Sequence, residues 1–237
     1  MTNILEKIGW TWWSCHSGWS FWWRWEECNH LLFRDNDRTT ETLLLGRVFS
    51  STQFQTHLNR FNWIFHTQDS IVSAPDFFNV TGNHDVGIKK EWFNPEALSR
   101  HINTFGPTNY IRTLGGVDLV VIDAVGLVSP TLSLRQDALM FLHSMAAILP
   151  SQRRPRVLMS HIPLFRPDDS LCGPRRDKRV IHQFHGISYQ NLIDAETTRL
   201  ILSSVQPMYV FSGDDHTTCL YHHPENVTEY TLATYSW

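Results

Sequence analysis

Three short polar motifs, each placed directly after an apolar stretch, constrain the fold of this chain more than any other feature. The first is the run Gly-Asn-His-Asp at residues 82–85, which follows an apolar stretch that ends at Val80. The second is centred on His161, and the third covers residues 214–216. Because the ends of neighbouring strands gather at one edge of a sheet, the three motifs predict a metal site along that edge.

The spacing of apolar residues predicts an alternation of strands and helices. Short apolar runs are expected to form buried strands, and segments with apolar residues every three or four positions are expected to form helices. The predicted strands cover 43–45, 77–80, 119–123, 156–160, 208–212 and 229–235, and the predicted helices cover 54–65, 96–105, 133–148 and 194–204. A capping box at 133–136 and the carboxylate of Asp194 are expected to start the last two helices. This alternation predicts an α/β layered sheet.

The composition fits a globular protein and excludes several classes. Of the 237 residues, 42% are hydrophobic and 18% are charged, and the net charge of -3 gives no basic excess for binding nucleic acid. No uncharged apolar stretch is long enough to span a membrane, and no targeting signal is readable. The four cysteines form no CxxC pair, which argues against a zinc knuckle. Cys172 and Cys219 each lie near a motif, and either a disulfide or two free thiols fits the sequence.

The first 41 residues differ in composition from the rest. Seven of the ten tryptophans fall between Trp10 and Trp25. Such a segment suits an aromatic anchor at a membrane interface, or it is not native coding sequence; the second interpretation is favoured. We therefore expect residues 1–41 to lie outside the fold and residues 42–237 to form one domain that is truncated at both ends.

The residue types in the three motifs suit metal-assisted hydrolysis. The side-chain oxygen of Asn83 is a neutral ligand for a divalent cation, and the imidazole of His161 is a common partner ligand. Asp214 and His216 alternate along the chain, so both can face one cavity. His84 is placed to donate a proton to a leaving group, with Asp85 holding its imidazole.

Longer blocks around these motifs carry a resemblance to a known family. They are Ser160–Asp169, Cys172–Pro174, Tyr189–Asn191, Phe211–His216, Cys219 and Tyr235–Trp237. Over residues 42–237 the chain resembles the calcineurin-like metallophosphoesterases. More narrowly, it resembles the eukaryotic branch that removes ethanolamine phosphate from glycosylphosphatidylinositol (GPI) anchors in the endoplasmic reticulum and Golgi.

The resemblance implies a layered β-sandwich flanked by helices, in the order α/β/β/α, with its N-terminal part incomplete. It implies two divalent metals, manganese being preferred, that are bridged by an aspartate and a hydroxide. One metal would be held by Asn83, His161 and Asp214 and the other by His216, with His84 as the general acid. The substrate-binding residues it assigns are Arg166, Tyr189 and Asn191. The implied partner is a phosphorylated glycolipid or GPI-anchored protein at the membrane of the endoplasmic reticulum or Golgi.

Two family motifs are missing from the sequence. The Asp-x-His pair with which the family opens has no counterpart before residue 46, and the place of the family's Gly-Asp-x-x-Asp is taken by residues 46–50. Arg47 and Ser50 stand at the two aspartate positions, and a cation at Arg47 would repel a metal. The chain is therefore expected to hold two ions, one or none. Three interpretations follow: an active phosphodiesterase; a non-catalytic relative in which Arg47 contacts phosphate; or an incomplete sequence whose full product carries the missing motifs in place of residues 1–50.

Overall fold

The computed structural model describes residues 46–65, 78–88, 93–167, 169–173, 176, 190–215, 217–224 and 226–232. Five features named above lie outside these ranges: the tryptophan-rich segment 1–41, the predicted strand 43–45, Tyr189, His216 and the block Tyr235–Trp237.

The described residues form one mixed sheet with helices around it. Its strands are β1 (Tyr110–Leu114), β2 (Val117–Ile122), β3 (Arg156–Ser160), β4 (Tyr209–Ser212), β5 (Cys219–His222) and β6 (Thr228–Thr231). The helices are α3 (Ser51–Phe65), α4 (Asn83–Val86), α6 (Pro95–Phe105), α7 (Ala124–Leu127), α8 (Leu132–Ala147) and α9 (Ala195–Val205), with short 3-10 turns η1 (Pro150–Gln152) and η2 (Asp169–Cys172). The predicted α/β class is confirmed.

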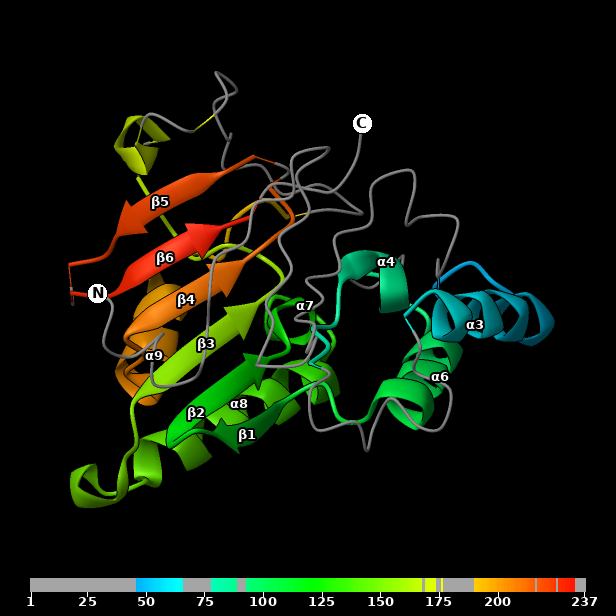
Figure 1. Cartoon of the computed structure of the whole chain (residues 1–237), viewed down its shortest axis with the longest axis horizontal. Coiled ribbons are helices and arrows are strands. Elements are labelled where there is room, and N and C mark those ends of the chain that lie inside the picture. Colours follow the sequence, from blue (N-terminus) through cyan, green and yellow to red (C-terminus); the bar gives the residue numbers. More distant parts are fainter. Residues whose placement is uncertain are drawn as a thin grey trace.

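The sheet order is β1-β2-β3-β4-β6-β5. Strands β2, β3, β4 and β6 run parallel to one another, and β1 and β5 are antiparallel strands at the two edges. The carboxyl ends of the parallel strands therefore share one edge, on the side where α4 and α6 lie (Figure 1). This arrangement brings the residues that follow β3 and β4 to the same edge as α4.

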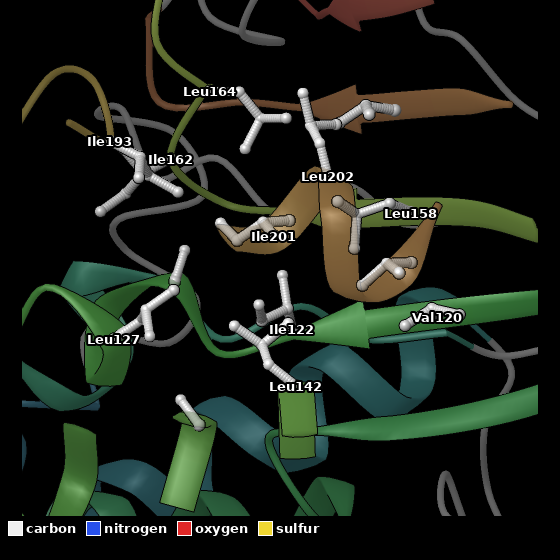
Figure 2. Packing of buried hydrophobic residues seen from close by; sticks show 14 of the residues in the cluster. Val120, Ile122, Leu127, Leu142, Leu158, Ile162, Leu164, Ile193, Ile201 and Leu202 are labelled. Carbon is white, nitrogen blue, oxygen red and sulfur yellow. The ribbon is translucent and has the colours of Figure 1, made fainter. Parts of the chain in front are cut away.

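Alternating residues of the central strands build a core on each face of the sheet. Val120, Ile122 and Leu158 pack on one face with residues of α8 and α9, as Figure 2 shows. Their neighbours Leu119 and Val121 pack on the opposite face. Every residue of β2 is buried, as expected for a central strand that is covered on both faces. Each large apolar side chain buried in this way contributes about 1.5–3 kcal/mol.

Most predicted elements are confirmed, because their apolar periodicity is strong. The strand 156–160 is found with the predicted bounds, and α9 begins at the predicted cap, where the carboxylate of Asp194 accepts the amide of Thr197 at 2.8 Å. Helices α3 and α6 and strands β2, β4 and β6 lie within a few residues of their predicted positions. Strands β1 and β5 were not predicted, since both are short and mix polar with apolar residues.

Two local predictions are wrong. Helix α8 starts at Leu132 after the N-cap Thr131, so the pattern at 133–136 does not cap it; Thr131 has the extended backbone that an N-cap requires. In the predicted strand 77–80, Phe78 forms only an isolated bridge. At Asn79 the Tyr110 hydroxyl occupies both backbone groups that a neighbouring strand would pair with: it accepts from the amide at 2.9 Å and donates to the carbonyl at 2.8 Å.

The expected sandwich has two sheets, and the described residues account for one of them. No helix within the described ranges has the length and apolar character needed to cross a bilayer.

Candidate metal centre

Three side chains from separate parts of the chain meet at the carboxyl edge of the sheet. Asn83 begins α4, His161 directly follows β3, and Asp214 lies two residues after β4. The Nε2 atom of His161 is 3.2 Å from the Oδ1 atom of Asn83 and 3.4 Å from the Oδ1 atom of Asp214. Asn83 and His161 are buried, and the side chain of Asp214 is 13% exposed. The structure therefore brings together three of the four predicted ligands, and the fourth, His216, lies outside the described residues.

Gly82 allows the close approach between the first two motifs. A Cβ atom at this position would lie 3.1 Å from Cε1 of the His161 ring. The turn itself is held by Asp85, whose Oδ2 accepts the amide of Gly82 at 3.0 Å. The sequence predicts that Asp85 orients His84; in the structure the carboxylate of Asp85 accepts the amide that precedes α4.

The loops after β3 and β4 are joined directly. The amide of Gly213 donates to the carbonyl of His161 at 3.0 Å. Asp214 itself has φ 60°, in the left-handed region, and the next amide, that of Asp215, donates back to the carbonyl of Gly213 at 2.7 Å. This combination is a γ-turn with Asp214 at its centre. The turn places the carboxylate of Asp214 beside the ring of His161.

The three donors fit a divalent cation. Ligands that bind one ion at about 2.0–2.2 Å lie roughly 3–3.5 Å from each other, which matches the spacing around His161 Nε2. One amide oxygen, one carboxylate oxygen and one imidazole nitrogen suit manganese, zinc or iron. Within the described part of the chain, no three His, Cys, Asp or Glu side chains gather as a metal site, so this triad depends on the amide of Asn83.

The other predicted site residues have different placements. His84 is partly exposed on α4. Asn191 is also partly exposed, in the turn whose residue Ile193 donates its amide to the carbonyl of Pro163, just beyond His161. Arg166 is 1% exposed, and its guanidinium contacts the carboxylate of Asp215 and the hydroxyl of Thr231. The burial of Arg166 favours a structural role over the predicted contact with substrate.

Arg47, the residue at the family's aspartate position, lies against α4. Its Nη1 atom is 3.4 Å from the carbonyl oxygen of Asn83, and its amide donates to the carbonyl of His84 at 3.3 Å. Its neighbour Gly46 permits this approach, since a Cβ there would lie 2.3 Å from the carbonyl oxygen of Asp85. The guanidinium cation of Arg47 therefore lies next to Asn83, one of the candidate ligands.

Two buried carboxylates at this edge were not predicted as site residues. Asp123 follows β2 and accepts the amide of Gly126 at 2.7 Å. Burial raises its pKa, while that hydrogen bond and the nearby His161 act in the opposite direction. Its position after an apolar run is the same signal that marked the three motifs. Glu229, in the middle of β6, is fully buried, and nothing in the local sequence distinguishes it.

Comparison with known proteins gives several relatives, while no family profile matches the chain. Cell division control protein 1 of Saccharomyces cerevisiae is 30% identical over 75% of this chain and 36% of its own length. Metallophosphoesterase 1 of Macaca fascicularis is 24% identical over 82% of this chain and 53% of its own length. The metallophosphoesterase 1 homolog of Drosophila melanogaster is 24% identical, with 81% and 54% covered.

The chain thus spans about a third to a half of the length of the curated relatives that it matches. Taken with the convergence of Asn83, His161 and Asp214 at the sheet edge, the similarity to proteins named metallophosphoesterase 1 supports a metallophosphoesterase family.

Proposed function

We propose that this chain is a metal-dependent phosphoesterase that hydrolyses a phosphodiester bond. The observation that carries the proposal is the meeting of Asn83, His161 and Asp214: the side-chain oxygens of Asn83 and Asp214 lie 3.2 Å and 3.4 Å from Nε2 of His161, as ligands of one divalent ion would. Manganese is the proposed ion. His216 is proposed to bind a second ion.

Each residue of the site has a distinct part in the proposed reaction. A divalent ion held by Asn83, His161 and Asp214 would polarise the phosphoryl group and stabilise its developing negative charge. His84, one residue after Asn83 and partly exposed, donates a proton to the oxygen of the leaving group. Asp85 holds the turn that presents both residues, through the amide of Gly82. Tyr189 and Asn191 are proposed to contact the substrate.

The proposed substrate is ethanolamine phosphate on a GPI anchor, at the membrane of the endoplasmic reticulum or Golgi. Two observations support this finer assignment. The sequence blocks that follow His161 resemble those of that branch, and relatives named metallophosphoesterase 1 match most of the chain. In addition, Cys172 and Cys219 form a disulfide, which is typical of proteins in oxidising compartments.

A second candidate function is phosphate binding without hydrolysis. The guanidinium of Arg47 lies next to Asn83, and arginine binds phosphate oxygens through paired hydrogen bonds. In this case the guanidinium of Arg47 would supply part of the positive charge that a second metal provides in the two-metal site. The chain would then bind a phosphorylated headgroup without cleaving it.

Two measurements on the purified 237-residue chain test the proposal: manganese content after loading and desalting, and hydrolysis of bis-para-nitrophenyl phosphate. His161→Ala is expected to lose both metal and turnover, and His84→Ala to keep the metal and lose turnover. His143→Ala is the matched control, since His143 is exposed on α8. Metal without turnover in the unmodified chain would favour the binding protein, and neither metal nor turnover would overturn the proposal.

A further inference from the structure

The candidate ligand Asp214 adopts a backbone conformation that it does not favour by itself. Its φ of 60° lies in the left-handed region, where a residue with a Cβ atom is strained unless its surroundings hold it. It is the centre of a γ-turn closed by the amide of Asp215 and the carbonyl of Gly213. The direction of the Asp214 carboxylate toward His161 therefore depends on whatever keeps this turn closed.

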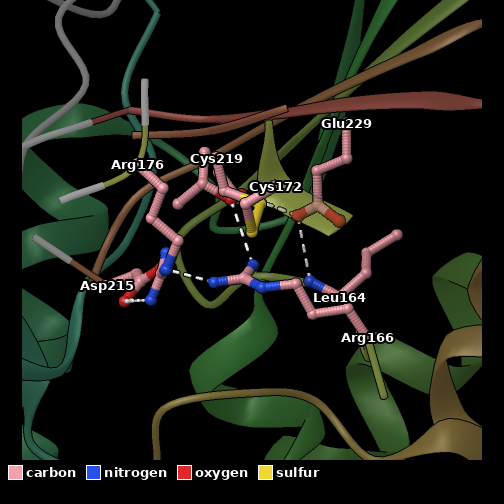
Figure 3. A network of polar contacts seen from close by, with 9 residues as sticks. Leu164, Arg166, Cys172, Arg176, Asp215, Cys219 and Glu229 are labelled. Atoms are coloured by element: carbon pink, nitrogen blue, oxygen red, sulfur yellow. Dashed lines mark hydrogen bonds and ion pairs between the residues drawn. A yellow bond between two sulfur atoms is a disulfide. The ribbon is translucent and has the colours of Figure 1, made fainter. Parts of the chain in front are cut away.

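The neighbouring carboxylate, that of Asp215, is held between two arginines (Figure 3). Arg176 contacts both of its oxygens, with Nη1 at 2.6 Å from Oδ2 and Nη2 at 3.4 Å from Oδ1. Arg166 contacts Oδ2 from the other side. The three side chains are 0–6% exposed, so these ion pairs are shielded from water and salt.

The two arginines are themselves fixed to the sheet. Arg166 donates to the hydroxyl of Thr231 in β6 at 3.3 Å. Between the two arginines in sequence lies Cys172, whose disulfide to Cys219 attaches this segment to the start of β5. Figure 3 shows the disulfide beside the Asp215 ion pairs. The segment whose arginines hold Asp215 is therefore bonded covalently to β5, the strand that follows Asp215 in the sequence.

We infer that Asp215 is a positioning residue for the metal centre. Held by Arg166 and Arg176, it keeps the γ-turn closed and so directs the Asp214 carboxylate toward the ion. The ion pairs of Arg166 and Arg176 with Asp215 thus act as a clamp on the turn. Without this clamp, Asp214 relaxes to a negative φ and its carboxylate turns away from His161. The inference rests on the proposed function, because it assumes that Asp214 binds the metal.

The first test compares the affinity of the full chain for Mn²⁺, followed by the paramagnetic resonance signal of the free ion. Asp215→Asn keeps the size of the side chain and removes its charge, and its dissociation constant is expected to rise about 10- to 100-fold. Arg176→Gln is expected to show a smaller rise, and Arg176→Lys to restore most of the affinity. Asp118→Asn is the matched control, since Asp118 is also a buried aspartate paired with an arginine, Arg154, but lies at the opposite edge of the sheet.

The second test needs no metal. Hydrogen exchange at the amide of Asp215, which closes the turn, is expected to be faster in metal-free Asp215→Asn than in the unmodified chain. Unchanged exchange in that variant would overturn the clamp, as would an unchanged Mn²⁺ affinity in a folded variant. If the unmodified chain binds no Mn²⁺ but the exchange rate responds as expected, the proposed function fails while the clamp stands as a structural device. If Asp215→Asn does not fold, Arg176→Gln gives the same two comparisons with one ion pair kept.

Discussion

The Nε2 atom of His161 lies 3.2 Å from the Oδ1 atom of Asn83, although 78 residues separate the two in the sequence. Their contact depends on Gly82, which leaves room for the ring, and on the parallel register of β2, β3 and β4, which sets where His161 emerges. Asp214 reaches the same point from the next strand.

Gly82→Ala is expected to weaken metal binding by about tenfold or more. The backbone at Gly82, with φ -106°, accepts alanine, but the new Cβ would lie 3.1 Å from the ring of His161 and push it away from Asn83. The Mn²⁺ dissociation constant measures the effect. Gly116→Ala controls for a general loss of stability: it strains the backbone, since φ is 80° there, but no atom lies within 4 Å of its Cβ, and it should leave the affinity for Mn²⁺ unchanged. Equal affinity in Gly82→Ala and the unmodified chain would mean that the ring of His161 does not bind the metal.

Mn²⁺ is expected to stabilise the folded chain. A ligand that binds only the folded state adds about 2.7 kcal/mol to the free energy of unfolding at 100 times its dissociation constant. Removing Mn²⁺ with a chelator should return the free energy of unfolding to its value without the ion. Asp214→Asn, which keeps the shape of the side chain and removes its charge, should show a much smaller gain in denaturant unfolding. An equal gain in Asp214→Asn and the unmodified chain would contradict the role of Asp214 as a ligand.

Tyr110 is expected to make stability fall between about pH 10 and pH 12. Burial raises the pKa of Tyr110 to about 12 from the ordinary 10.0, and the hydrogen bond with Asn79 lowers it only in part. Because the folded-state pKa is the higher one, the stabilisation is complete below pH 10 and is lost as the pH rises through 12. The loss is at most about 2.7 kcal/mol, two units at 1.36 kcal/mol each.

The measurement is the free energy of unfolding as a function of pH, for the unmodified chain and for Tyr110→Phe. The variant should be less stable at neutral pH, because it lacks the hydrogen bonds to Asn79, and it should lose less stability above pH 10. Tyr230, whose pKa burial also raises, remains in both chains, so the difference between them isolates Tyr110. Parallel curves would show that Tyr110 is not protected from ionisation.

Reducing the bond between Cys172 and Cys219 is expected to destabilise the chain by roughly 3–4 kcal/mol. The bond closes a loop of 47 residues, and removing such a cross-link restores conformational freedom to the unfolded state. Urea unfolding with and without reductant measures the loss. The double variant Cys172→Ser and Cys219→Ser should have the same free energy of unfolding as the reduced chain, and reductant should not change it. If reductant does destabilise the double variant, another cysteine is responsible for the effect.

Glu229 is expected to be among the most sensitive buried positions. Its Oε1 atom accepts the amide of Leu164 at 3.0 Å and the hydroxyl of Ser212 at 2.7 Å, and its Oε2 atom lies 2.8 Å from Nε2 of His223. Glu229→Ala leaves these buried groups without their partner and should cost about 3–5 kcal/mol. Glu229→Gln, which keeps the acceptor for Leu164 and Ser212, should cost less.

Urea unfolding measures both variants of Glu229, and Glu96→Ala on α6 is the control, since the Glu96 side chain is 87% exposed. The control should change stability by less than about 0.5 kcal/mol. A loss below about 1 kcal/mol in Glu229→Ala would show that water can replace the carboxylate.

Local sequence was sufficient to predict the elements with strong apolar periodicity, such as β3 and α9. Local sequence failed to predict the secondary structure where a side chain distant in the sequence binds the backbone. The residues around Asn79 look like a strand, but the hydroxyl of Tyr110 takes the hydrogen bonds that a neighbouring strand would use. It also missed β1 and β5, which are edge strands with a weak apolar pattern.

The sequence by itself determined which residue types stand at strand ends, and hence that Asn83, His161 and Asp214 are candidate ligands. Only the tertiary structure decided that the three meet and that Cys172 pairs with Cys219. It also decided that Arg166 faces Asp215 in the interior. The physical reason is that strand order and register set the contacts between distant residues, whereas the periodicity of a sequence reports only which face of its own element each residue occupies.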